Sequence, residues 1–277
     1  MKMHDSRPDP IYSFMVDYHI HTPRCGHASG ELSDYVERCI IKGISEIGIA
    51  DHFPLLHIKD PRLSMSLEEL PYYVEDFERL RDCFPKAVLK LGVEADYVPS
   101  ELEKLSNLIK DYPFDYVYGA VHYIDGWGFD DPRYLDGYGH WDLFELWSRY
   151  FETLGDAAEC GIFDILAHPD LIKKFGFKPD EDLSSIYLKA VRRIAKAGVT
   201  VEVNTAGLRK PVGEIYPSSD FLMLCKDNGV AVTLGSDAHN PEEVGAGFDL
   251  ALEMLNKCGY EEIAVFRERR RSSVRIN

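Results

Sequence analysis

The sequence lacks any long hydrophobic run. No stretch of its 277 residues reaches the roughly 18–20 continuous apolar residues that a membrane helix requires. The N-terminal residues lack both an apolar segment of signal-peptide length and a small-residue cleavage site. We therefore expect a cytoplasmic protein without a membrane partner.

Paired cysteines and an excess of basic residues are also missing. The six cysteines include no Cys-x-x-Cys motif, so we expect reduced core residues rather than a disulfide framework. The chain has 31 Lys and Arg, 47 Asp and Glu, and a net charge of −16, so we expect no nucleic-acid partner. A small anionic substrate remains compatible, because a bound metal ion creates a local positive field. The basic run over 266–277 is expected to be a solvated terminus that pairs with the acidic body.

No internal repeat or linker divides the chain, so residues 1–277 are predicted to form one domain. Short β-rich runs alternate with helical patterns along it. Strands are predicted over 14–22, 46–53, 87–98, 114–124, 163–171, 199–206 and 230–239. Helices are predicted over 31–43, 66–84, 100–110, 140–160, 181–197, about 218–228, and 241–257. Such alternation is typical of a parallel sheet, and we favour an α/β fold in which about seven strands close into a barrel.

Most of the predicted strands end in side chains that commonly bind metal ions. Parallel α/β folds bind ligands at the carboxyl ends of their strands, and His, Glu and Asp suit zinc, iron and manganese. A single such histidine is more often a hydrogen-bonded core residue, but a cluster at one pole of the barrel indicates a metal site. The nine candidate ligands are His19, His21, His27, His52, Glu94, His122, His168, Asp237 and His239.

The spacing of these residues supports one shared site. His19 and His21 lie two residues apart, so their side chains point to the same side of a strand. Asp237 and His239 have the same spacing. His27 follows in a loop whose glycines allow the chain to turn back toward the first strand.

The segments that carry these residues resemble the polymerase-and-histidinol-phosphatase (PHP) superfamily. They are "DYHIHTPRCGHASG", "IADHFP", "LGVEADY", "AVHYIDGWGFD", "ILAHPDLIKKFG", "VEVNTAGLRKP" and "LGSDAH". The similarity extends in order over residues 15–240. Two of the segments, "VHYIDGWGFD" and "NTAGLRKP", resemble the histidinol-phosphatase branch in particular.

The resemblance implies a distorted (β/α)7 barrel that holds three divalent metal ions at the carboxyl ends of its strands. It implies that His19, His21, Glu94 and Asp237 bind the first ion. It also implies that His27, His52 and His239 bind the second ion, and that Glu94 bridges to a third ion bound by His122 and His168. Asp51 is expected to contact a ligating histidine rather than to bind a metal ion.

The resemblance implies a metal-dependent phosphomonoesterase. Metal ions lower the pKa of bound water and neutralise phosphoryl oxygens, so we expect a hydroxide that bridges two metal ions to attack phosphorus. Asp237 or His239 is expected to handle the proton that passes to or from the water or the leaving alkoxide. The resemblance implies hydrolysis of L-histidinol phosphate to L-histidinol and inorganic phosphate, a step of histidine biosynthesis.

The substrate is expected to contact residues in the loops at the same pole. Arg209 is the first candidate for the phosphate, because its planar guanidinium can bind two oxygens, and Lys173, beside Lys174, is the second. In the loop over 125–134, Trp127 and Phe129 are predicted to line an apolar pocket, and Asp125 or Asp130 to meet a substrate ammonium. The alternatives are solvated surface cations and an ordinary structured loop.

Two other functions remain open from the sequence. A nuclease, or a phosphoesterase that acts on another phosphate ester, is disfavoured by the acidic charge and the lack of a basic, aromatic groove. A non-catalytic metal-binding domain would have lost ligands, and none is lost. The sequence does not distinguish among zinc, iron and manganese, and it leaves the oligomeric state unknown.

Overall fold

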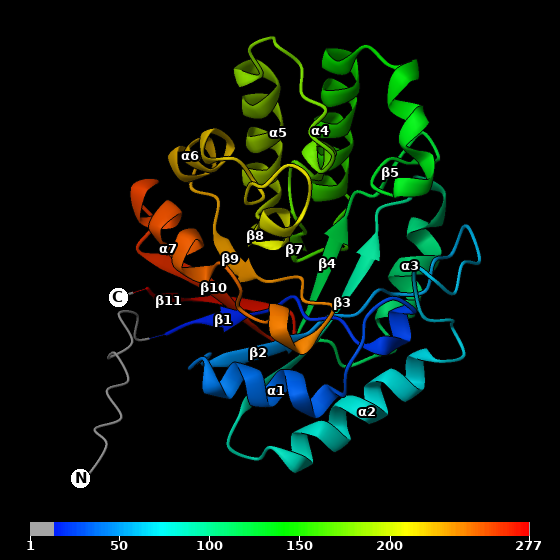
Figure 1. Cartoon of the computed structure of the whole chain (residues 1–277), viewed down its shortest axis with the longest axis vertical. Helices are drawn as coiled ribbons and strands as arrows, with labels where there is room; N and C mark the ends of the chain where they lie inside the picture. The colour runs from blue at the N-terminus through cyan, green and yellow to red at the C-terminus, as the bar shows by residue number, and fades with distance from the viewer. Residues whose placement is uncertain (1–13, 277) are drawn as a thin grey trace.

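The computed structural model describes residues 14–276, which form a nearly closed barrel of seven parallel strands surrounded by helices (Figure 1). The strands follow one another in chain order around the barrel and pair in parallel. A parallel bridge between Ile20 and Ala238 joins the first strand to the last. The strands are β1 (Val16–Asp17), β2 (Glu46–Ile49), β3 (Val88–Asp96), β4 (Tyr116–Ala120), β7 (Ile165–Leu166), β8 (Thr200–Asn204) and β9 (Val232–Gly235).

Seven helices in the described part of the chain connect these strands and cover the outside of the barrel (Figure 1). Local signals fix several of their ends. The Asp142 side chain accepts a hydrogen bond from the Glu145 backbone N–H at the start of one helix, and another ends at Gly198 with φ 72°. The helices are α1 (Leu32–Ile41), α2 (Leu70–Cys83), α3 (Leu102–Ile109), α4 (Leu143–Glu159), α5 (Ser184–Ala197), α6 (Ser219–Asp227) and α7 (Phe248–Lys257).

The predicted barrel and the order of its strands and helices are confirmed. Every observed strand is shorter than predicted, because the residues beyond it leave the sheet to form the loops at the carboxyl pole. The predicted domain also included residues 1–13 and 277, which lie outside the described residues. No helix within residues 14–276 is long and apolar enough to cross a membrane.

Aromatic side chains fill the interior of the barrel. Tyr116 stacks on Tyr18, with ring centroids 4.9 Å apart, and its hydroxyl donates to the Tyr18 carbonyl at 2.6 Å. Gly48 and Gly92 make room for this side chain, because a Cβ atom at Gly48 would lie 2.0 Å from its hydroxyl oxygen and one at Gly92 would lie 2.2 Å from its ring. Close packing of this kind leaves the barrel a solid core rather than a channel.

The basic C-terminal run is mostly exposed and pairs with the acidic body as predicted, but it is ordered in a hairpin rather than a simple terminus. It forms most of an antiparallel hairpin of β10 (Glu262–Arg267) and β11 (Arg270–Arg275). Phe266 is buried with its ring centroid 6.3 Å from that of Tyr18, and Arg269 pairs with Asp164. Asp164 directly precedes β7, so the hairpin covers the amino-terminal end of the barrel, opposite the predicted site.

Candidate metal centre

Glu94, at the end of β3, lies at the centre of the nine predicted ligands. Its Oε2 lies 2.9 Å from Nδ1 of His52 and 3.3 Å from Nε2 of His19. Its Oε1 lies 2.8 Å from Nε2 of His168 and 3.7 Å from Nε2 of His122. The histidines follow β1, β2, β4 and β7, so strand closure brings them to one carboxylate, as the sequence predicts.

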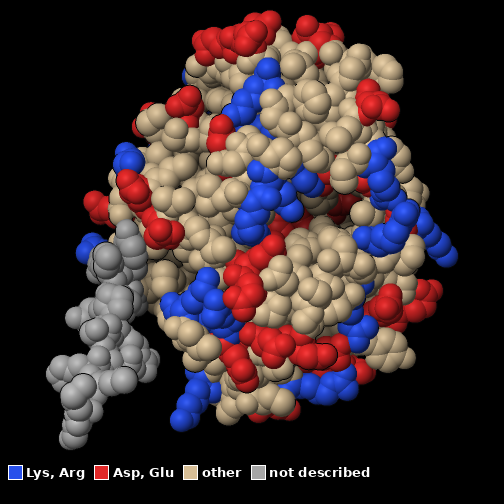
Figure 2. Space-filling view, viewed as in Figure 1, with Lys and Arg blue, Asp and Glu red and all other residues tan. Residues whose placement is uncertain are grey.

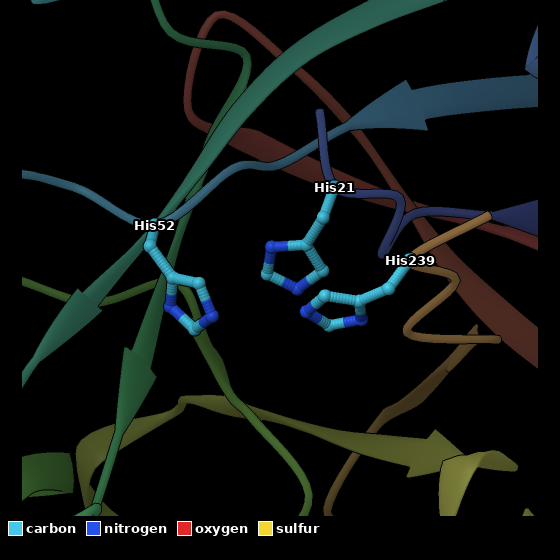
Figure 3. Close-up of side chains that lie close together, drawn as sticks. All are labelled: His21, His52 and His239. Carbon is cyan, nitrogen blue, oxygen red and sulfur yellow. The ribbon is translucent and has the colours of Figure 1, made fainter. Parts of the chain in front are cut away.

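The remaining ligands close the cluster from the other side of the barrel. Asp237 and His239 follow β9, and Oδ1 of Asp237 lies 3.0 Å from Nε2 of His21. Figure 3 shows the rings of His21, His52 and His239 turned toward one another from three separate loops.

Among the described residues, five groups of three side chains each have potential ligand atoms within 4.8 Å of one another, and two of these groups include Cys25. The other three groups consist only of predicted ligands and cover most of the predicted centre. They are His19, His21 and Glu94; His21, His52 and His239; and Glu94, His122 and His168.

Buried carboxylates orient the histidine rings from behind, and the sequence analysis missed most of them. Nδ1 of His19 lies 2.7 Å from Glu202, and Nδ1 of His122 lies 2.6 Å from Asp96. Asp51 lies 3.3 Å from Nδ1 of His21, which agrees with its predicted contact to a ligating histidine. Such contacts fix the ring and its tautomer and leave the other nitrogen free for a metal ion. Glu202 is fully buried in the run "VTVEVN", and an acidic residue within an apolar strand is the signal that could have identified it.

Charge within the cluster shifts the pKa of several groups. Burial lowers the pKa of His21, but hydrogen bonds to Asp237 and Asp51 raise it to about 9. Burial also opposes charge on His122, while Asp96 raises its pKa to about 10. These rings are therefore protonated at neutral pH unless a cation takes the place of the proton.

Other members of the cluster already have the form that binds metal ions. Burial, together with the charges of His52 and His21, lowers the pKa of His27 to about 4. Burial opposes ionisation of Glu94, but His52 and His19 hold its pKa well below the usual value. A neutral imidazole and an ionised carboxylate are both metal ligands.

The contact between His27 and His239 fits a bound cation. Nδ1 of His27 lies 3.0 Å from the Cys25 carbonyl, and Nδ1 of His239 lies 3.1 Å from the Asp237 carbonyl. Each Nδ1 must therefore carry the proton and donate, which leaves a lone pair on each Nε2 of the neutral rings. The two Nε2 atoms lie only 3.0 Å apart, and a divalent ion between them would turn this repulsion into coordination. The buried Nε2 atoms of His19 and His21 face only carboxylate oxygens that are themselves candidate ligands, Glu94 Oε2 at 3.3 Å and Asp237 Oδ1 at 3.0 Å. The donor set therefore fits divalent metal ions.

Two of the ligands have a backbone conformation that side chains with a Cβ atom rarely adopt. His168 has φ 28° and Asp237 has φ 52°. Positive φ values are unfavourable for residues other than glycine and cluster at functional sites.

A cavity of about 620 Å³ adjoins the centre. Three of the candidate ligands, His27, His52 and His122, lie in its wall. Most of the rest of the wall comes from the loop after β2 and from the segment that contains β5 (Tyr123–Ile124) and β6 (Trp127–Gly128). Figure 2 shows a hollow on this face with acidic side chains inside it and basic side chains beside it.

Only some of the loop residues that were predicted to contact the substrate line the cavity; the others lie in the core or on the exposed surface. Trp127, Asp130 and Lys174 line the cavity. Phe129 is fully buried and packs its ring against Tyr150, with centroids 5.6 Å apart, so it supports the wall rather than forming it. Asp125 is exposed and pairs with Arg149 at 2.7 Å, and it is not among the residues that line the cavity.

Lys173 does not fit the predicted phosphate site. Its ammonium is buried, donates to the Ile215 carbonyl at 2.8 Å, and pairs with Asp170 at 3.1 Å and Glu214 at 3.3 Å. A lysine has three donors, and protein groups use all three here. Buried charges require such partners, so Lys173 has a structural role beside the site.

Arg209 lies next to the metal centre. It ends the short helix Ala206–Arg209 after β8, and its Nη2 donates to the Ser236 carbonyl at 2.7 Å and the Asp237 carbonyl at 3.2 Å. Its Nη1 has no hydrogen-bond partner among residues 14–276. Arg209 therefore holds the backbone of a candidate ligand and keeps one donor free.

Comparison with known proteins agrees with this geometry. The chain is 35% identical over 257 residues to a probable histidinol-phosphatase of Deinococcus radiodurans, with 92% of this chain and 98% of the relative covered. It is 25% identical to the histidinol-phosphatase of Bacillus subtilis, with 86% and 98% covered. The crystal structure of histidinol phosphate phosphatase from Lactococcus lactis, complexed with zinc, L-histidinol and phosphate, has the same fold. It matches with a TM-score of 0.80 at 22% identity and covers 93% of this chain and 98% of that one.

The PHP domain family matches residues 17–206, more than half of the chain. This match contains seven of the nine candidate ligands, and the last two, Asp237 and His239, lie in the loop after β9. The predicted resemblance is thereby confirmed, and the chain belongs to the PHP family.

Proposed function

We propose that this protein is a metal-dependent phosphatase that hydrolyses L-histidinol phosphate to L-histidinol and inorganic phosphate. The observation that carries the proposal is the convergence of histidine ligands from four separate strands on Glu94, beside a cavity large enough for a small substrate. The proposal is supported by relatives named histidinol-phosphatase that match over nearly their whole length. We further propose that residues 1–277 act as one domain.

We propose that three divalent metal ions, of zinc, iron or manganese, occupy the centre. The number follows from the family resemblance, and the overlapping sets of ligand atoms offer donors for more than one ion. Imidazole and carboxylate ligands suit all three metals. When bound, such ions lower the pKa of a coordinated water molecule and neutralise the phosphoryl oxygens.

Two residues of the chain would manage the proton. Burial raises the pKa of Asp237, but His19 and His21 hold it well below the usual value, so its carboxylate is ionised. We propose that it takes the proton of the attacking water because it lies beside the centre. Its other oxygen, Oδ2, lies 3.4 Å from the amide nitrogen of Asn204, which helps to orient it. Burial and the charge of His21 hold the pKa of His239 well below its usual value and keep the ring neutral. It has no extra proton to donate, so it would only relay to the leaving alkoxide the proton that the attacking water gives up.

The phosphate and the leaving group would occupy different parts of the site. Arg209 would contribute its free Nη1 to the phosphate, because a guanidinium forms charge-assisted hydrogen bonds with phosphoryl oxygens. The rest of the substrate would enter the adjoining cavity, where Trp127 offers an apolar surface and Asp130 lies near the candidate ligand His122.

A panel of phosphate esters, assayed on enzyme of known metal content, tests the proposal. We expect the highest kcat/KM for L-histidinol phosphate, and low values for sugar phosphates, nucleotides and a phosphorylated peptide. A single-stranded oligonucleotide serves as the substrate for the alternative nuclease activity. Faster cleavage of the oligonucleotide, or equal rates on all monoesters, would contradict the proposed function.

A further inference from the structure

His57 lies in the wall of the cavity but takes no part in the metal centre. It belongs to the loop after β2 and lines the cavity together with His52 and Trp127. It is absent from every set of neighbouring ligand atoms among the described residues. The mechanism proposed above therefore leaves this side chain without a function.

The His57 ring is held by packing against an aromatic side chain. It meets the ring of Tyr123 edge to face, with centroids 4.6 Å apart and an interplanar angle of 84°. Tyr123 directly follows His122 and is itself backed by Gly128, where a Cβ atom would lie 3.3 Å from the tyrosine ring. The two rings form a fixed part of the wall close to the metal centre.

The nitrogens of His57 make no hydrogen bond within residues 14–276. Nε2 is buried and lacks a partner there, so Nδ1 is the nitrogen that can reach the cavity. A fixed imidazole with a free nitrogen at a cavity wall offers one specific hydrogen bond to a ligand.

We propose that His57 determines substrate specificity by hydrogen bonding to a nitrogen-containing aromatic ring on the leaving group. This inference rests on the proposed function, whose substrate carries an imidazole. An imidazole has both a donor and an acceptor nitrogen, so it complements Nδ1 of His57 in either tautomer. A leaving group with a phenyl ring would fill similar space but leave Nδ1 without a partner, which is how a polar pocket rejects an apolar analogue.

The test compares two substrates in variants of His57. His57→Phe keeps an aromatic ring against Tyr123 but removes the hydrogen bond, whereas His57→Asn keeps a polar group near the position of Nδ1. The substrates are L-histidinol phosphate and L-phenylalaninol phosphate, which differ in the ring. His140→Phe is the matched control, because His140 is exposed and is not among the residues that line the cavity.

We expect His57→Phe to lower kcat/KM for L-histidinol phosphate by about 10–100-fold, the range for one lost hydrogen bond in a buried site. Its kcat/KM for L-phenylalaninol phosphate should stay the same or rise, and His57→Asn should recover part of the loss on L-histidinol phosphate. Metal content and Tm should match those of the wild-type protein and of His140→Phe.

An equal fall in kcat/KM for both substrates would overturn the proposal and assign His57 a structural role. An unchanged ratio of the two kcat/KM values would overturn it as well. If His57→Phe does not fold, the two substrates are compared in His57→Asn, where equal changes would also overturn it. Failure of the proposed function is distinct, because wild-type enzyme would then not prefer L-histidinol phosphate over other monoesters.

Discussion

Glu94 joins two halves of the metal centre through its two oxygens. One oxygen faces His19 and His52, and the other faces His122 and His168. Each oxygen therefore belongs to a different set of ligand atoms, which supports the bridging role that the family resemblance implies.

Replacement of Glu94 by alanine should therefore remove more than one metal ion per protein. The remaining histidines would keep only partial coordination at both positions. Elemental analysis of purified Glu94→Ala measures the loss, and Glu103→Ala on the exposed side of α3 is the control. An unchanged metal content in Glu94→Ala would rule out the bridge.

Replacement of Arg209 by alanine should lower kcat/KM for L-histidinol phosphate by roughly 10–150-fold. Hydrogen bonds to charged groups contribute about 1.5–3 kcal/mol, and each 1.36 kcal/mol changes a rate tenfold. Steady-state kinetics measure the change, and inhibition by inorganic phosphate should weaken in parallel. Arg209→Lys should restore only part of the activity, because an ammonium cannot form two parallel contacts.

The metal content of Arg209→Ala separates two roles for this residue. A normal metal content together with low activity indicates a contact with phosphate. Since Arg209 also donates to the carbonyl of Asp237, loss of metal would show that the arginine mainly positions that ligand. Activity close to that of wild type, with metal ions present, would exclude both roles.

The sequence predicts the candidate ligands better than the residues around them. A ligand residue at the end of a strand must face the carboxyl pole, so strand position alone locates it. Contacts such as those of Lys173 with Asp170 and Glu214, or the burial of Phe129, depend on how separate loops pack. No local pattern distinguishes a buried, paired lysine from one that is free to bind phosphate.

At the scale of elements, the alternation of apolar runs predicts all seven strands and seven helices of the barrel. The hairpin of β10 and β11 escapes prediction because its second strand is rich in arginine and largely exposed. Its position depends on contacts with distant residues, including Phe266 with Tyr18 and Arg269 with Asp164. The charge pattern alone therefore gives no sign of β11, because tertiary packing rather than local sequence produces this strand.

Truncation of Phe266 should destabilise the protein without changing its chemistry. Replacing a buried phenylalanine by alanine costs about 3–5 kcal/mol, which corresponds to a fall in Tm of roughly 6–20 °C for a chain of this size. Because the hairpin covers the pole opposite the metal centre, kcat/KM per metal-loaded enzyme should stay within about twofold of wild type, well below one 1.36 kcal/mol step.

Differential scanning calorimetry and steady-state assays at low temperature separate the two effects of Phe266→Ala. Leu250→Ala is the control for stability, because the Leu250 side chain is exposed on α7. A large loss of activity at unchanged metal content would show that the hairpin influences the distant site.

At the scale of the whole molecule, removal of metal ions should abolish activity but leave the barrel folded. The ligands lie at the strand ends, whereas the core is held by buried apolar and aromatic side chains. Chelated protein should still unfold in one cooperative thermal transition, at a lower Tm because bound ions stabilise the folded state. Full activity in protein shown to be free of metal would refute the mechanism.

Metal affinity should rise steeply with pH. The pKa values of His21 and His122, about 9 and about 10 without metal, lie above the usual value, so both rings remain protonated until the pH passes this range. Each proton displaced by a metal ion makes affinity rise about tenfold per pH unit below that pKa. Competition with a chelator of known affinity at pH 6, 7 and 8 measures the slope.

Not every histidine of the centre contributes to the slope of metal affinity against pH. His27 has a pKa of about 4, so it is already neutral over this range and adds nothing to the dependence. Affinity that does not change between pH 6 and 8 would show that no ring loses a proton on binding.

The left-handed backbone at His168 and Asp237 has an evolutionary consequence. Glycine would adopt these conformations freely, whereas other residues in such regions cost of order 1–3 kcal/mol each. This chain has a metal ligand at both places despite that cost, so the barrel without metal ions is less stable than one with glycine there. Where catalysis is no longer needed, substitution of glycine at these two positions would increase stability. We therefore expect a homologue that has lost catalysis to carry glycine in place of one or both ligands.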